Sequence, residues 1–182
     1  MTLTPRLRRL ALTAHVTSSV GWLGAIAGFL ALAIAGLIST DAQTVRGAYL
    51  AMDVIGWFVL VPLSLASLLT GLVQSLASTW GLFRHYWILF KLLINLVATT
   101  LLLVHMQVVS HVAGAAAETS LSSADLVGMR IQLLADATLA LLVLLVATVL
   151  AVYKPRGMTR YGQRKQREQH AKQAERRTAS VP

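Results

Sequence analysis

Four long apolar runs constrain the fold of this chain more than any other feature of its sequence. They cover residues 10–38, 52–78, 86–109 and 131–153, and a helix needs about 20 mostly apolar residues to cross the hydrocarbon core of a bilayer. Each run is apolar throughout rather than alternating, which disfavours membrane-spanning strands. Because hydrocarbon offers no water to backbone N–H and C=O groups, such runs are expected to be helical. The sequence therefore predicts an all-α fold, a bundle of four transmembrane helices.

The composition agrees with a membrane protein and excludes several other classes. Only 13% of the residues are charged, whereas a soluble domain averages roughly 25%. The chain has no cysteine, which excludes disulfides, thiolate-bound metals and iron–sulfur clusters. It also lacks a phosphate-binding glycine loop, a nucleophile elbow and an H-E-x-x-H pattern, so no soluble-enzyme motif indicates an activity.

The distribution of lysine and arginine predicts the orientation of the bundle. Basic residues precede the first run, lie between the second and third runs, and follow the fourth, where nine of the 16 are found. The other two connections contain only Arg46 and Arg130. Basic loops stay on the cytoplasmic side, and an even number of helices puts both ends of the chain on one side. We therefore predict a bacterial inner-membrane protein with both termini cytoplasmic.

Residues 154–182 form a basic tail, of which residues 156–177 are polar and rich in glutamine and arginine. Met158 and Tyr161 are the only candidate apolar anchors, so we expect a solvated, disordered cytoplasmic tail that fixes the topology. The alternative is a helix that lies on anionic lipid. The positive charge of the tail is expected to fix the orientation of the protein in the membrane, and nucleic-acid binding is not expected.

Polar residues inside the runs are informative, because an ionisable group in hydrocarbon is costly unless it finds a partner. Pro62 is expected to kink the second helix near its middle. Small and polar residues recur along that helix in alternating steps of four and three residues, which places them in a stripe on one face. Such a face is predicted to contact other helices rather than lipid. The stripe comprises Asp53, Trp57, Leu60, Ser64, Ser67, Gly71, Gln74 and Ser78. One face of the first helix comprises His15, Ser18, Ser19 and Trp22.

A first polar layer is predicted near the cytoplasmic boundary. His15 and Lys91 should each lie about 9 Å inside it at 1.5 Å per residue, with Asn95 one turn beyond Lys91. Imidazole is a usual ligand of haem iron, so these residues and Trp22 are the candidate binding set for haem b, with His15 axial and Lys91 neutralising a propionate. Two simpler interpretations stay open: Lys91 reaches back to the interface, and His15 is a hydrogen-bonded structural residue.

A second polar layer is predicted near the outer boundary, and Gln132 belongs to it. Its imidazole and carboxylate groups suit a divalent metal such as copper. The alternatives are histidines that simply lie at the interface, and an Asp136 carboxylate that pairs with Arg130 or caps a buried polar contact. The candidate metal ligands are His105, His111, Asp53 and Asp136.

Short patterns give the chain a family resemblance. The first run contains HVTSSVGWLG from residue 15, the third contains WILFKLL from residue 87, and TGL from residue 70 lies between them. Over roughly residues 10–153 the chain resembles an uncharacterised family of small bacterial four-helix membrane proteins. It is distantly similar to the membrane domain of copper-resistance D proteins and to the HemJ-type protoporphyrinogen oxidase.

The resemblance implies three classes of function. In HemJ-type enzymes the first-helix histidine ligates haem and the third-helix lysine is needed, roles that would fall to His15 and Lys91. The chain departs from that pattern, because residues 29–34 are apolar where an arginine-bearing motif is expected, and the third-helix histidine comes later, at His105. In copper-resistance proteins this type of domain is associated with copper uptake. A haem-dependent membrane oxidoreductase, a copper or ion transporter, and a non-catalytic subunit of an oligomer or membrane partner are therefore the competing expectations.

Overall fold

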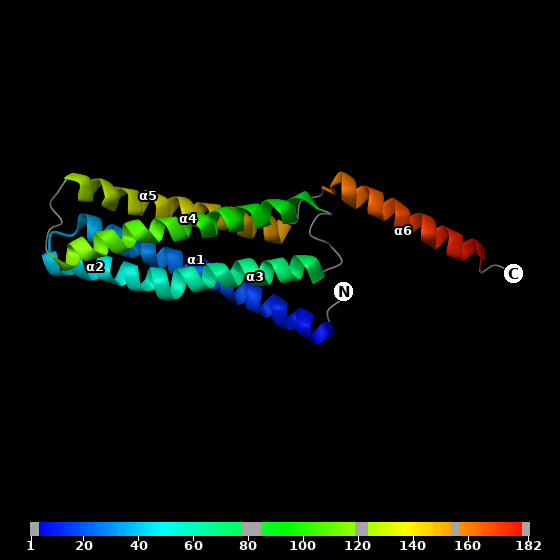
Figure 1. Cartoon of the computed structure of the whole chain (residues 1–182), viewed down its shortest axis with the longest axis horizontal. Coiled ribbons are helices and arrows are strands. Elements are labelled where there is room, and N and C mark those ends of the chain that lie inside the picture. The colour runs from blue at the N-terminus through cyan, green and yellow to red at the C-terminus, as the bar shows by residue number, and fades with distance from the viewer. Residues whose placement is uncertain (1–3, 78–84, 119–123, 154–156, 180–182) are drawn as a thin grey trace.

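The computed structural model describes residues 4–77, 85–118, 124–153 and 157–179. In these residues four helices are long and apolar enough to cross a membrane, at Pro5–Ile38, Ala42–Leu76, Tyr86–Ala117 and Leu126–Tyr153. The all-α fold and the four-helix membrane bundle predicted from the sequence are thus confirmed (Figure 1).

Local capping starts the first two helices. In α1 (Pro5–Ile38), Pro5 occupies the first turn, where its missing N–H is no loss, and the Thr4 hydroxyl accepts a hydrogen bond from the backbone of Leu7. After a three-residue turn, the Asp41 carboxylate accepts a hydrogen bond from the Thr44 backbone N–H at 2.9 Å and begins α2. The turn is short, so the first and second spans are antiparallel neighbours.

The second span consists of α2 (Ala42–Ile55), a π-helical turn η1 (Gly56–Leu60) and α3 (Val61–Ala77). In the π turn the Val61 N–H bonds to the carbonyl of Gly56, five residues back. Pro62 has no N–H to offer and disrupts the regular hydrogen-bond ladder at this point. The sequence predicts a kink near Pro62, and the structure has a π turn directly before it. The last residue of the predicted stripe, Ser78, lies outside the described residues.

The spans form a closed ring of neighbours. The helix α1 packs against the second span and α5 (Ala124–Tyr153), and α4 (Tyr86–Ala117) packs against the same two spans. The helices α1 and α4 therefore lie on one diagonal of the bundle and run in the same direction (Figure 1). Polar residues near the start of each thus belong to the same end of the bundle, which we call the N-terminal end.

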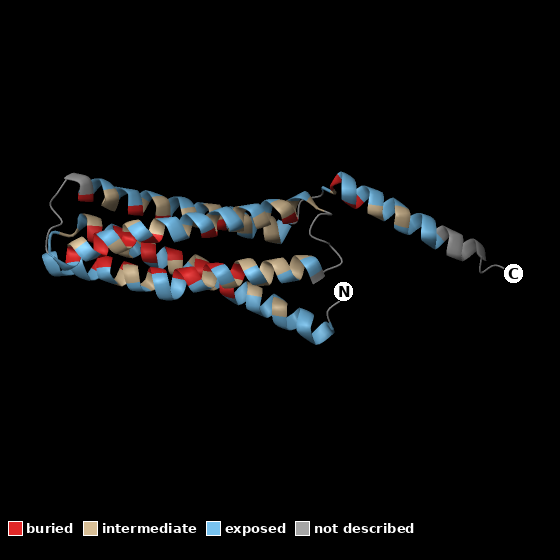
Figure 2. Ribbon diagram, viewed as in Figure 1, coloured by how far each residue is buried: buried red, intermediate tan, exposed pale blue. Residues whose placement is uncertain are grey.

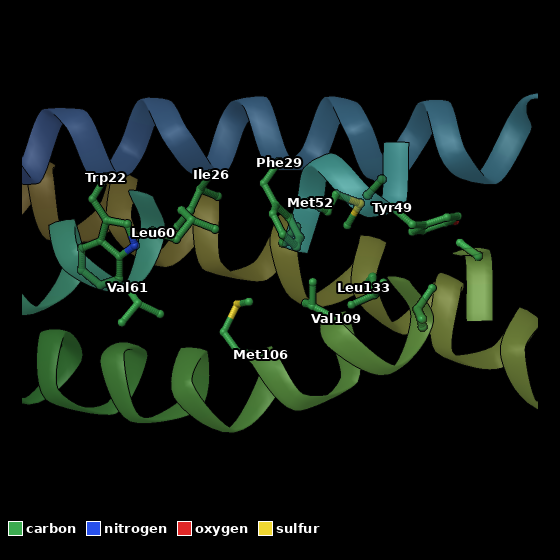
Figure 3. Close-up of a cluster of buried hydrophobic side chains, with 14 of the residues drawn as sticks. Trp22, Ile26, Phe29, Tyr49, Met52, Leu60, Val61, Met106, Val109 and Leu133 are labelled. Atoms are coloured by element: carbon green, nitrogen blue, oxygen red, sulfur yellow. The ribbon is translucent and has the colours of Figure 1, made fainter. Parts of the chain in front are cut away.

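The apolar core lies mainly in the half of the bundle away from the N-terminal end (Figure 2). Figure 3 shows its central contacts, in which Trp22, Ile26 and Phe29 of α1 face Met106 and Val109 of α4. Beyond Ser67 in α3 and Leu144 in α5, no described residue of those helices is buried. Near the N-terminal end, α1 leans away from the other helices (Figure 1), so the polar layer predicted there lies in the more loosely packed half.

The basic tail differs from expectation. The sequence predicts a disordered segment after residue 153, whereas the structure contains a helix, α6 (Arg160–Ala179), that extends away from the bundle (Figure 1). The Glu168 carboxylate accepts a hydrogen bond from the Lys165 ammonium at 3.1 Å and forms an ion pair with Arg164 at 3.4 Å. Pairs spaced by three or four residues stabilise an isolated helix. The tail and the start of α4 meet at one end of the bundle, where the Tyr86 N–H donates to the carbonyl of Gly157.

Candidate functional site

His15 is held against α3 by one edge of its imidazole ring. Its Nδ1 lies 3.1 Å from the carbonyl oxygen of Ser67 and 3.2 Å from Oγ1 of Thr70. A carbonyl oxygen only accepts hydrogen bonds, so this contact assigns the hydrogen to Nδ1. The lone pair of a neutral ring is then on Nε2, which has no hydrogen-bond partner among the described residues.

Ser67 joins three helices at this level. Its hydroxyl lies 2.8 Å from the hydroxyl of Ser19 on α1 and accepts a hydrogen bond from the Asn95 amide on α4 at 3.4 Å. About two turns farther along α3, the Gln74 side-chain amide donates a hydrogen bond to the carbonyl of Ala11 at 2.8 Å. These contacts explain the polar stripe of the second span, because its side chains bond to neighbouring helices instead of facing lipid.

Gly71 provides the surface on which the His15 ring rests. A Cβ atom at this position would lie only 3.0 Å from Cε1 of the ring and 3.4 Å from Nδ1. Any larger side chain would therefore push the imidazole away from the Ser67 carbonyl. The TGL pattern noted in the sequence has a physical reason here, since Thr70 and Gly71 both contact His15.

Lys91 and Asn95 belong to the same end of the bundle as His15. Lys91 is partly buried and lies near enough to His15 for their charges to interact. Asn95 lies nine residues after the start of α4 and His15 ten after the start of α1, whereas Lys91 lies only five residues in. The shared depth predicted from the sequence therefore fits Asn95 more closely than Lys91.

Two buried polar atoms lie deeper along the same helices. Among the described residues, Nε1 of Trp22 and Oγ1 of Thr99 have no hydrogen-bond partner, although Trp22 is 2% exposed and Thr99 is 3% exposed. The sequence pattern does not indicate Thr99, because a threonine is unremarkable in an apolar run. Its spacing was the available signal, since it follows Lys91 by eight residues and Asn95 by four. An unsatisfied buried polar atom costs roughly 1–3 kcal/mol, so each is a place where water or a ligand atom would add stability.

The structure separates the residues of the predicted outer layer. Nδ1 of His105 pairs with the Asp136 carboxylate at 3.0 Å, and its buried Nε2 has no hydrogen-bond partner in the part of the chain that the structure describes. The Asp53 carboxylate instead accepts a hydrogen bond from the Ser110 hydroxyl at 2.6 Å. That hydroxyl accepts a hydrogen bond from the indole N–H of Trp57 at 3.1 Å. His111 is exposed.

These positions do not assemble one metal site. Among the described residues, no group of three or more histidine, aspartate or glutamate side chains is placed to hold a metal ion. The proposed pairing of Asp136 with Arg130 is wrong, because the Arg130 guanidinium donates to the Tyr49 hydroxyl at 2.8 Å and to the Gly36 carbonyl at 2.6 Å. Arg130 lies on the side of α5 that faces α1 and α2, whereas Asp136 faces α4.

The His105–Asp136 pair is also deeper than the sequence predicts. His105 lies twelve residues before the end of α4, and Asp136 lies twelve residues after the start of α5. At 1.5 Å per residue both are about 18 Å from the helix ends. The difference arises because α4 continues to Ala117 and α5 begins at Ala124, beyond the apolar runs that defined the predicted spans.

The comparisons with known proteins give no family for this chain: no protein-family model, no curated protein and no solved structure matches it. The chain is an all-α membrane protein by its own four apolar helices.

Proposed function

We propose that this integral membrane protein binds haem or a related metalloporphyrin between α1, α3 and α4, and that Nε2 of His15 would hold its metal. The observation that carries the proposal is the hydrogen bond from Nδ1 of His15 to the Ser67 carbonyl. Histidine ligands of metals commonly donate their second ring N–H to a carbonyl or carboxylate, which fixes the ring and directs the lone pair of the other nitrogen to the metal.

The surrounding residues fit an amphipathic ligand with carboxylates at one end. Lys91 lies at the N-terminal end of the bundle, where its ammonium group would neutralise a propionate. Trp22 and Thr99 lie deeper and present unsatisfied polar atoms. Haem supplies redox or gas-binding chemistry when bound, and the chain supplies the ligand nitrogen, the counter-charge and an apolar surrounding. The described residues of this site contain one imidazole, which differs from the paired histidines of dihaem b-type electron carriers.

The test is an absorption spectrum and a metal analysis of protein purified in mild detergent. We expect a Soret band and bound iron in the wild-type protein, and loss of both in His15→Ala. His111→Ala is the matched control, since His111 is exposed on α4 and should leave the spectrum unchanged. A colourless, iron-free protein, or a Soret band that persists in His15→Ala, would contradict the proposal.

The same sample separates the two alternative functions. Copper transport through the outer layer would give bound copper that is lost in His105→Ala and kept in His15→Ala. A non-catalytic subunit would give neither chromophore nor metal, together with a co-purifying membrane protein. We favour the haem proposal because His15 combines an oriented lone pair with a nearby cation, whereas the outer candidates are divided between two separate contacts.

A further inference from the structure

The helix α4 is the span least covered by its own bundle. Only 11% of its most apolar 18-residue window is buried, against 28% for the first and second spans. Its exposed face nevertheless contains polar residues. Gln107 and His111 are both exposed, and neither has a hydrogen-bond partner among the residues that the structure describes.

Gln107 lies at a depth where lipid is a poor environment. It precedes the end of α4 by ten residues, about 15 Å in a helix of about 48 Å. A hydrocarbon core about 30 Å thick and centred on the bundle leaves about 9 Å of helix outside it at each end. The Gln107 amide then lies about 6 Å inside the hydrocarbon, where its N–H and C=O groups need a protein partner.

The spacing around Gln107 is that of a helix–helix seam. Thr100, Val104, Gln107, His111 and Gly114 follow one another in steps of four, three, four and three residues, and all five are exposed. Such steps define the contact line of two helices that pack at a small left-handed angle. At Gly114 a Cβ atom would meet nothing within 4 Å, so the face is open for close approach of a second backbone.

We propose that two copies of this chain pair through this seam, with α4 packed parallel to α4 about a two-fold axis along the membrane normal. The occupant is a second copy because an amide both donates and accepts hydrogen bonds, so Gln107 is complementary to its own symmetry mate. The seam lies on the exposed side of α4, away from the core face that contains Met106 and Val109. Pairing there leaves the His15 layer in each copy untouched, so the two proposals are independent.

Disulfide cross-linking in native membranes tests the geometry, since the chain has no cysteine of its own. Val104→Cys lies on the seam, and Val20→Cys on α1 is its matched control, because both valines are 63% exposed. We expect a cross-linked dimer with Val104→Cys and little with Val20→Cys. Cross-linking through Val20→Cys instead, adjacent to the exposed Gly24, or through neither position, would overturn the proposal.

The dimer's dependence on Gln107 tests the chemistry. Gln107→Leu should weaken dimerisation in lipid nanodiscs or diluted micelles about tenfold, the effect expected of an interhelical hydrogen bond in a membrane. Gln43→Leu, the same substitution at an exposed glutamine in the first turn of α2, should leave dimerisation unchanged. Energy transfer between labelled copies measures both. Equal effects of the two substitutions, or monomeric wild-type protein, would refute pairing through Gln107, whatever the absorption spectrum shows.

Discussion

At the scale of single residues, the orientation of His15 depends on two contacts from α3, the Ser67 carbonyl and the open surface of Gly71. The imidazole donates to backbone rather than to a side chain, so the contact survives most substitutions at Ser67 itself. Gly71 is different, because its lack of a side chain is what allows the ring to approach.

Gly71→Val is therefore expected to displace the ring and lower the free energy of unfolding by roughly 1–3 kcal/mol, the usual effect of overpacking. It should also reduce any ligand bound through Nε2. Gly24→Val is the control, since a Cβ at Gly24 meets nothing within 4 Å. Unfolding in mixed micelles measures the stability, and equal effects of the two substitutions would show that Gly71 has no special role.

The His105–Asp136 pair permits a second test at this scale. His105→Leu leaves the Asp136 carboxylate without its partner in a largely apolar environment, so we expect a loss of roughly 1–3 kcal/mol in unfolding free energy. Adding Asp136→Leu should recover part of this loss, because removing both members of an ion pair within an apolar span is less damaging than removing one. A double-mutant cycle in mixed micelles measures the coupling, and strictly additive losses would contradict it.

At the scale of elements, local signals in the sequence account for how helices begin and where one is irregular. Asp41 begins α2, and Pro62 follows the π turn of the second span. The π turn shifts the phase between α2 and α3, and Gly56 within it lies against Met106, where a Cβ would be 2.6 Å from the sulfur. The side chain missing at Gly56 thus allows α4 to approach the irregular turn.

The cap of α2 gives a pH-dependent prediction. The Thr44 hydroxyl, and then its backbone N–H, hold the pKa of Asp41 below its ordinary value by hydrogen bonding to the carboxylate. Because the folded pKa is the lower one, the stabilisation is present above the unfolded pKa of about 4 and is lost as pH falls through the folded value. The thermal midpoint of the wild-type protein should fall in this acidic range more than that of Asp41→Ser, which caps without titrating. Circular dichroism measures both, and identical acid profiles would contradict the prediction.

At the scale of the whole molecule, the ring of four spans divides the bundle into two halves of different character. The half away from the N-terminal end has a close-packed core around Trp22, Phe29 and Met106. The other half contains the polar cross-links of His15 and Ser67, where α1 leans outward. The candidate ligand site therefore lies toward the N-terminal end from the apolar core, and the proposed dimer seam lies on the exposed side of α4.

The four helices and the membrane class were predictable from the sequence, because twenty consecutive apolar residues have one stable form in lipid whatever surrounds them. Helix faces were also predictable, since the stripe that includes Ser67, Gly71 and Gln74 follows from the helical period alone. The hydrogen-bond and ion-pair partners of individual side chains were not predictable in this way. Asp136 bonds to His105 rather than to Arg130, because partner choice depends on which helices adjoin and on where each one ends. Those quantities come from contacts between distant parts of the chain, and only the tertiary structure decides them.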